Sequence, residues 1–401
     1  MIAYEDGLKI ILDSVNILGT EKLPLVKCGG MVIAEDAFAR SDLPPFDNSA
    51  MDGYAVVASS TSGATRESPA VLRFVRDIPA GIAESYTVGP GEAARIGTGA
   101  KVPGGADTVV IVEETELKGE EVWVFREYPP GLNIRRAGED FTAGERGIPA
   151  GKPIRPSEIS FLAANGYAEV EVYRKPRVGI LSSGSELVPH GQEISGAKIR
   201  DSNGPMICSL VEKYGGVPEI HGIFPDDEGL LTAFVREKAE RFDFFITFGG
   251  ISMGAHDYLK TALEKGGARM AFWKVAIRPG KPFGFGKLKE TLVFALPGNP
   301  GSAFVTFEAF VKPALCKARG FMPPYGEYLT ATLTEDFPKK EGVTVFSRGN
   351  LEGEFPAYRF SPFKKQGSGM ISTMVETNAI MIAPAGSEKI SKGETVTVFP
   401  T

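Results

Sequence analysis

Charged residues in glycine-rich loops mark the stretch from Asp243 to Pro300. Three apolar runs in this stretch each end in a loop rich in glycine or proline, and these loops contain one acid and three bases: Asp257, Lys274, Arg278 and Lys281. Gly249 and Gly250 follow the first run, and glycines there let backbone amides close on an anion. A nearby carboxylate can hold a metal ion. The stretch predicts a site for a phosphorylated or otherwise anionic ligand.

Earlier in the chain, another apolar run begins the block GILSSGSELV. It leads into a loop of small and hydroxyl residues that contains Ser183, Gly184 and Ser185, with Glu186 directly after it. In an open α/β sheet the ligand crevice lies at this position, although a plain strand-to-helix turn has the same composition. Asp226 follows a further apolar run in FPDDE, where capping of the next helix is the alternative.

Glu186, Asp226 and Asp257 are expected at three different strand ends. Parallel strands bring their carboxyl ends to one edge of a sheet, so these acids can converge although they lie far apart in sequence. Clustered carboxylates repel one another, and a divalent cation relieves the repulsion. We therefore predict that these three acids bind a metal ion.

The first third of the chain contains three weaker motifs. Asp52 lies in PPFDNSAMDGYAV, where an ordinary turn is the simpler interpretation. Thr98 lies between two glycines and could present a hydroxyl and amides to an anion, or serve only a tight connection between strands. Arg135 and Arg136 precede a glycine turn. Arginine suits bidentate phosphate contacts, but a solvated charged turn is the alternative.

Composition excludes several classes of protein. The chain has 401 residues, 43% of them hydrophobic, and a net charge of -6, which argues against a nucleic-acid-binding surface. No apolar run approaches the roughly 18 residues that a membrane span needs. The N-terminus has acidic residues at helical spacing and is not a signal peptide. The three cysteines match no zinc spacing and suit buried thiols, so we expect a cytoplasmic protein.

The pattern along the chain changes several times. Helical spacing is seen at 4–18 and again at 155–164, where Ser157 is a plausible N-cap. Short β-branched runs between 71 and 124 indicate a β-rich module. Strand candidates then alternate with helices, which predicts one α/β domain with a parallel-type sheet flanked by helices. These strands are expected at 177–181, 220–224, 244–248, 272–277 and 292–296. The final 75 or so residues read as short strands of a small all-β domain.

Eight blocks in order resemble the MoeA family of molybdopterin molybdenumtransferases, which includes the E domain of gephyrin. They are SAMDGYAV, RIGTGAKVPGGADTVV, RRAGEDF, GILSSGSELV, IRDSNGPM, GGISMGAHDY, FWKVAIRPGKPFGFG and LPGNPGSAF. The resemblance fades after residue 322, where only FSRGNL and QGSGMIST are suggestive. It implies a multidomain α/β plus β fold. An elongated, discontinuous dimerisation domain would cover 1–40 and 143–174, a β-rich domain 41–142, the molybdopterin-binding α/β domain 175–322, and a β-barrel 323–401. Composition alone does not reveal the discontinuous domain.

The resemblance also implies a reaction, in which adenylylated molybdopterin and molybdate combine and AMP is released. Mg²⁺ is the expected cofactor, the chain is expected to form a homodimer, and the molybdopterin adenylyltransferase is an expected partner. Residues that match functional positions of the family are Asp52, Thr98, Glu186, Asp226, Asp257, Lys274, Pro297, Pro300, Arg348 and Ser368. Arg278 stands where many members have lysine, which keeps the charge but changes the geometry.

Three alternatives stay open at this stage. The α/β domain also resembles molybdopterin adenylyltransferases and a domain of competence-damage-type nucleotide hydrolases, but these lack the first two blocks and the terminal β domain. A pterin-binding scaffold without catalysis is the second alternative. The third is the same chemistry with tungstate, an oxyanion of nearly the same size and charge.

Overall fold

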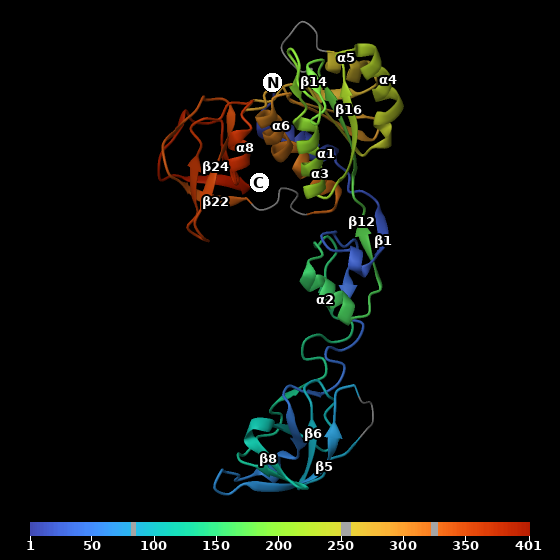
Figure 1. Cartoon of the computed structure of the whole chain (residues 1–401), viewed down its shortest axis with the longest axis vertical. Coiled ribbons are helices and arrows are strands. Elements are labelled where there is room, and N and C mark those ends of the chain that lie inside the picture. The colour runs from blue at the N-terminus through green and yellow to red at the C-terminus, as the bar shows by residue number, and fades with distance from the viewer. Residues whose placement is uncertain (82–85, 250–257, 322–327) are drawn as a thin grey trace.

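The computed structural model describes residues 1–81, 86–249, 258–321 and 328–401. The molecule is elongated, with an α/β domain and a β-barrel side by side at one end and a β-rich domain at the other (Figure 1). A small module connects the two ends. None of the described helices is long and apolar enough to cross a membrane.

The α/β domain is built on a six-stranded sheet in the order β16-β13-β17-β21-β20-β18. The first four strands are parallel: β16 (Val217–Phe224), β13 (Arg177–Ser183), β17 (Phe244–Phe248) and β21 (Thr291–Leu296). Of the last two, β20 (Gly284–Leu288) is antiparallel to both of its neighbours, β21 and β18, so β18 (Arg269–Phe272) again runs in the direction of the first four. β17 and β21 are buried along their whole length, as expected for strands covered on both faces.

Helices cover both faces of this sheet. One face packs on α1 (Tyr4–Ser14), α3 (Asn203–Lys213), α6 (Pro300–Thr306) and α7 (Lys312–Ala318), with a π-turn at Phe307–Val311 between the last two. The other face packs on α4 (Glu228–Lys238) and α5 (Tyr258–Lys265). Thus α1, from the segment expected in the elongated domain, contributes Leu8, Ile11 and Leu12 to the α/β core.

The predicted strand at 272–277 is wrong. β18 ends at Phe272, and β19 (Ile277–Arg278) pairs with the barrel strand β24 instead of the central sheet. The residues between them bond to the chain's first residues, since the Ile2 N–H donates to the Lys274 carbonyl and the Ala276 N–H to the Ile2 carbonyl. Partners distant in sequence therefore decide the pairing of this segment.

The C-terminal region is a closed barrel of five strands, as expected: β22 (Leu329–Leu333), β24 (Thr344–Glu352), β25 (Arg359–Pro362), β26 (Ala379–Ala383) and β28 (Thr395–Pro400). Closure comes from pairing of β24 with both β25 and β26. The short helix α8 (Ser372–Glu376) and the strand pair β23 (Phe337–Pro338) and β27 (Lys389–Ile390) lie beside it.

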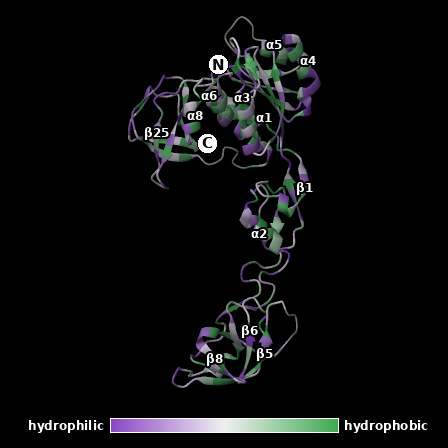
Figure 2. Cartoon of the chain, viewed as in Figure 1, coloured by the Kyte–Doolittle hydropathy of each residue, from purple (hydrophilic) through white to green (hydrophobic). Residues whose placement is uncertain are grey.

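The β-rich domain contains a six-stranded sheet in the order β7-β4-β6-β5-β9-β8. Its strands are β4 (Gly53–Val56), β5 (Ala70–Ile78), β6 (Glu92–Ile96), β7 (Thr108–Ile111), β8 (Thr115–Lys118) and β9 (Glu121–Val124). Alternate residues enter two different cores, Tyr54 and Val56 on one face and Ala55 on the other. Hydrophobic residues accordingly gather along the strands and packed helices in Figure 2.

The connecting module joins segments that are distant in sequence. β1 (Thr20–Pro24) pairs with β12 (Glu169–Tyr173), and β2 (Ala37–Phe38) with β11 (Arg146–Ile148). The module's core also includes Leu162 of α2 (Pro156–Ala164). The predicted N-cap of this helix is wrong: Arg155 precedes the first turn, and its N–H donates to Glu158. The Ser157 hydroxyl also donates to Glu158.

Candidate functional site

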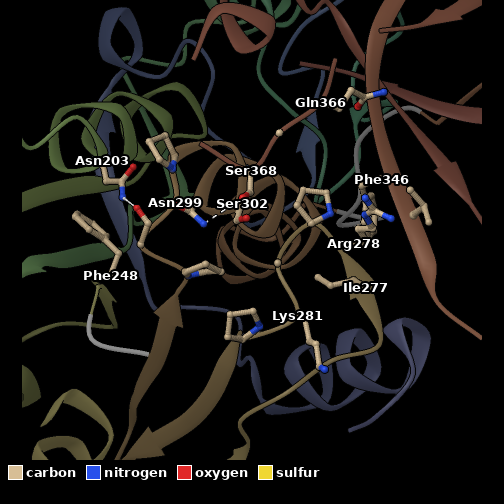
Figure 3. A pocket seen from close by; sticks show the side chains of 18 of the residues that line it. Asn203, Phe248, Ile277, Arg278, Lys281, Asn299, Ser302, Phe346, Gln366 and Ser368 are labelled. Carbon is tan, nitrogen blue, oxygen red and sulfur yellow. Dashed lines mark hydrogen bonds between the residues drawn. The ribbon is translucent and has the colours of Figure 1, made fainter. Parts of the chain in front are cut away.

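A cavity of about 1310 Å³ lies where the α/β domain meets the barrel. Loops after β13, β17 and β21 form one side, and segments near β23, β24 and β25 form the other (Figure 3). Eight of the residues singled out from the sequence line it: Ser183, Glu186, Gly249, Arg278, Lys281, Pro297, Pro300 and Ser368. Its volume exceeds the 300–1,000 Å³ typical of small-ligand pockets, so it can accommodate a nucleotide-sized ligand.

The loop after β13 brings together the predicted hydroxyl and carboxylate residues. The Ser185 N–H donates to Asp226 (3.1 Å), and the Ser183 hydroxyl donates to the same carboxylate (3.4 Å). The Ser185 hydroxyl also accepts a hydrogen bond from the Asp226 N–H (3.1 Å). The Glu186 carboxylate folds back over Gly184, where a Cβ would lie 2.7 Å from its Oε2. Gly184 has a φ of +157°, a conformation that other residues rarely adopt, so glycine is favoured there. Two carboxylates, those of Glu186 and Asp226, thus flank one short loop.

Gly249 follows β17 and approaches the first loop closely. Its φ is +95°, and a Cβ at this position would lie only 1.8 Å from the Ser183 carbonyl oxygen. No other residue fits there, so the loops after β13 and β17 form one continuous wall of the cavity. Gly250 and Asp257, the other predicted residues of this loop, lie outside the described residues.

The cationic residues of the cavity come from both domains. Arg278 is placed by the pairing of β19 with β24, and Lys281 follows it in the next turn. Six cations line the cavity: Arg200, Arg278, Lys281, Lys339, Lys340 and Lys364. Within the described ranges none has a carboxylate oxygen within 4.0 Å, and the buried Lys339 Nζ has no hydrogen-bond partner. Four carboxylates share the lining: Glu186, Asp201, Glu335 and Asp336. This excess of unpaired positive charge suits an anionic ligand.

The loop between Pro297 and Pro300 connects β21 to α6. Asn203, at the start of α3, donates to the Gly298 carbonyl (2.7 Å). Asn299 donates to the hydroxyl of Ser368, which belongs to the barrel (3.1 Å). Both bonds are drawn in Figure 3. This loop therefore joins the two sides of the cavity.

Arg348 and Lys274 do not line the cavity among the described residues. Arg348 is almost fully buried, and its guanidinium donates to the carbonyls of Gly367 (3.0 Å) and Met370 (3.1 Å). Burial lowers the pKa of Arg348 from its ordinary value. Arg348 thus supports the segment that contains Ser368 and places a buried positive charge beneath it.

The remaining predicted residues lie at the other end of the same molecule, in and beside the β-rich domain (Figure 1). Asp52 accepts two hydrogen bonds from Thr98, one from the N–H (2.7 Å) and one from the hydroxyl (2.8 Å). Arg135 is exposed in β10 (Ile134–Arg135), which pairs with β3 (Asn48–Ser49). Arg136 donates to Asp47 (2.6 Å). Within one chain these four residues do not reach the cavity.

No sequence motif places Asn299, Gln366 or the barrel lysines in a site. Asn299 stands in the LPGNPGSAF block, but nothing in that block indicates the barrel residue that it contacts. Lys339, Lys340 and Lys364 belong to two short lysine pairs beside short strands, and only the folded chain brings them to the cavity.

Family models match almost the whole chain in order: the MoeA N-terminal region (domains I and II) at residues 2–166, a probable molybdopterin binding domain at 179–317, and the MoeA C-terminal region (domain IV) at 330–401. Molybdopterin molybdenumtransferase 2 of Mycobacterium tuberculosis is 34% identical, over 100% of this chain and 99% of its own. Molybdopterin molybdenumtransferase of Bacillus subtilis is 36% identical over 92% and 86%.

Solved structures agree with these matches. The crystal structure of a molybdopterin biosynthesis moeA protein from Pyrococcus horikoshii OT3 has a TM-score of 0.85 and 33% identity, and the match covers 100% of both chains. Similarity of sequence and of fold therefore extends over all domains and both sides of the cavity, and the chain belongs to the MoeA family of molybdopterin molybdenumtransferases.

Proposed function

We propose that this chain is a molybdopterin molybdenumtransferase that inserts molybdate into adenylylated molybdopterin and releases AMP. The observation that carries the proposal is the cavity between the α/β domain and the barrel. It is lined by unpaired cations, hydroxyl groups and glycine backbone, and it is large enough for a nucleotide-sized anion. Full-length similarity to relatives with this name supports the same reaction.

The two sides of the cavity would bind different parts of the substrates. Ser183, Ser185 and the amides of Gly184 and Gly249 lie at strand ends, where small residues and backbone N–H groups suit phosphate oxygens. By sequence Gly250 would join them. Arg278 and Lys281, with Lys274 nearby in the chain, would attract molybdate. Pro297 and Pro300 shape the loop that separates these groups.

The carboxylates beside the phosphate-binding loop fit Mg²⁺, which prefers oxygen ligands and commonly binds through one or two carboxylates together with substrate phosphates. Glu186 and Asp226 flank Ser185, and Glu186 lines the cavity. We propose them as ligands, with Asp257 as the third on sequence grounds. The described residues alone contain no group of three acids, cysteines or histidines suited to a metal. When bound, Mg²⁺ offsets the negative charge of the diphosphate.

We further propose that two chains form the working unit. Asp52, Thr98, Arg135 and Arg136 lie far from the cavity of their own chain, so they would act at the cavity of a second copy. The adenylyltransferase that makes the substrate is a natural partner. A cytoplasmic location suits three free cysteines whose burial raises the pKa of their thiols.

The test is AMP release by the purified chain from adenylylated molybdopterin, with and without molybdate and Mg²⁺. We expect release that requires both ions. Tight binding of the pterin without AMP release would instead identify a scaffold. A parallel titration with tungstate tests the preference between the two oxyanions, which we expect to favour molybdate.

A further inference from the structure

A contact between Asn299 and Ser368 crosses from the α/β domain to the barrel beside the cavity (Figure 3). Asn299 Nδ2 donates to Ser368 Oγ (3.1 Å), and the Gly301 N–H donates to the Ser368 carbonyl (2.8 Å). Both Asn299 and Ser368 line the cavity. The α/β domain therefore contacts the side chain and the main chain of Ser368 separately.

The main chain around Ser368 is also held from the barrel. Gln366 accepts from the Arg348 N–H (2.8 Å) and donates to the Ser347 hydroxyl (2.7 Å) and the Phe363 carbonyl (2.7 Å). Arg348 then donates to the carbonyls of Gly367 and Met370, on either side of Ser368. Because these bonds and the Gly301 N–H fix the backbone, the Asn299 side chain is not needed to place Ser368. Its remaining effect is on the orientation of the hydroxyl.

A serine hydroxyl has one proton to donate and two lone pairs that accept. The Ser368 oxygen uses one lone pair for Asn299, so its proton must be directed elsewhere. Across the described part of the chain, no protein acceptor takes this proton. Since Ser368 lines the cavity, the proton is available to an oxygen atom of a bound ligand.

We propose that Asn299 is a positioning residue that fixes Ser368 as a hydrogen-bond donor, and that this donor favours fully deprotonated tetrahedral oxyanions such as molybdate over hydrogen phosphate. The inference rests on the proposed function and adds a determinant of specificity to it. Arg278 and Lys281 line the same cavity and can only donate. The O–H group of hydrogen phosphate is a donor and cannot accept a hydrogen bond from Ser368, Arg278 or Lys281. Hydrogen phosphate would therefore form one hydrogen bond fewer than molybdate, and a site that leaves a polar group unpaired binds such an analogue much more weakly.

The test compares Asn299→Ala, Ser368→Ala and the double variant. In Asn299→Ala we expect the molybdate concentration that gives half-maximal AMP release to rise about three- to tenfold, while kcat and the melting temperature change little. In Ser368→Ala we expect a rise of about tenfold or more, because a bond to a charged group is lost. Adding Asn299→Ala to Ser368→Ala should change the value less than about twofold, since Asn299 acts through Ser368. Additive effects would overturn the proposal.

Two further variants sharpen the result. Asp at position 299 can only accept, so Asn299→Asp should turn the Ser368 proton away from the cavity and weaken molybdate binding more than Asn299→Ala does. Wild-type molybdate binding by Asn299→Asp would overturn the proposal. Asn378→Ala is the matched control: its amide exchanges two hydrogen bonds with Leu351 in the barrel, away from the cavity lining, and should leave molybdate saturation unchanged.

Calorimetric titration with molybdate and with phosphate at pH 8 measures binding without the reaction. The wild type should bind molybdate at least about tenfold more tightly than hydrogen phosphate, and Ser368→Ala should narrow that ratio. Equal wild-type affinities would overturn the inference. If the wild type bound molybdate selectively but released no AMP, the proposed function would fail while the role of Asn299 would stand.

Discussion

Asp52 stabilises a turn and is also a candidate functional residue. One of its carboxylate oxygens accepts both hydrogen bonds from Thr98, the N–H bond and the hydroxyl bond. These bonds hold the pKa of Asp52 below its usual range, with the backbone N–H of Thr98 the larger cause, so the side chain is charged at neutral pH. The turn therefore presents a fixed negative charge at the end of the molecule remote from the cavity.

Asp52→Asn separates the structural role from the functional one. The amide oxygen of asparagine can accept the same two hydrogen bonds, so we expect the melting temperature to change little. Loss of the charge should lower molybdate-dependent AMP release by one or more orders of magnitude if Asp52 acts on the ligand or cation of a second chain. Full activity in this variant would reduce Asp52 to a turn residue.

Arg278 offers a test of the oxyanion site. Arg278→Ala should raise the molybdate concentration needed for half-maximal activity by about tenfold or more, because a charged hydrogen bond is lost. Binding of the adenylylated pterin should change much less. Arg278→Lys, which keeps the positive charge, should recover most of the loss. Equal defects toward both substrates would argue against separate sites.

Residue types predicted much of the cavity, because glycines, hydroxyl residues and charges follow apolar runs at the strand ends where an open α/β sheet binds its ligands. Ser183, Glu186, Arg278 and Lys281 were found in this way. Asn299 and Gln366 were not, because an amide side chain is common in loops and its role depends on its partner. Those partners lie 69 and 18 residues away in sequence.

At the scale of elements, buried apolar runs predicted the strands correctly where helices cover both faces of the central sheet. β17 and β21 match their predicted ranges closely. The segment after β18 was not predictable, since its backbone pairs with Ile2 and with Thr344 of β24 instead of a neighbouring strand. The reversed direction of β20 was not predictable either, because apolar content does not specify strand direction.

Helix α2 provides a prediction about stability. Glu158 is buried and accepts hydrogen bonds from the backbone N–H and the side chain of Arg155 and from the Ser157 hydroxyl, and Lys152 forms an ion pair with it. The Arg155 side chain is the main cause that holds the pKa of Glu158 well below its usual range. A lowered folded-state pKa stabilises the protein above the unfolded pKa of about 4.3, and this contribution is lost as the pH falls below it.

Glu158→Gln should therefore lower the free energy of unfolding by about 1–2 kcal/mol at pH 7. This is less than a fully buried ion pair would contribute, because Arg155 and Lys152 are partly exposed and solvent screens their charges. The difference from the wild type should shrink below about pH 4. Glu116→Gln, at an exposed pair with Lys118, is the control and should cost less than about 0.5 kcal/mol. A Glu158→Gln effect that did not vary with pH would contradict this account.

At the scale of the whole molecule, composition predicted an α/β domain and a terminal β domain, because each is one continuous stretch. The connecting module could not be predicted from composition, because β1 and β12 pair although nearly 150 residues separate them. Local sequence patterns do not indicate such a pairing, and only the resemblance to a family implied that the two segments belong together.

The separation between the β-rich domain and the cavity leads to a complementation test. Asp52→Asn and Glu186→Gln should each be nearly inactive alone. Mixed and allowed to exchange chains, they should recover about a quarter of wild-type activity, because half of the dimers would contain one intact cavity out of two. No recovery despite exchange, or a sedimentation mass near the 42.9 kDa of one chain, would refute sites shared between chains.

Pairing of β19 with β24 has a consequence for how the chain could be divided. Residues 276–278 belong to the α/β segment of the sequence, yet the Thr344 N–H of the barrel donates to the Ala276 carbonyl. A fragment of residues 328–401 would lose this strand and expose the edge of β24 to pairing with other chains. The barrel should therefore not fold correctly when it is transferred alone. Recombination at its sequence boundary would separate it from β19, which completes its sheet, and from Arg278 of β19, which lines the cavity.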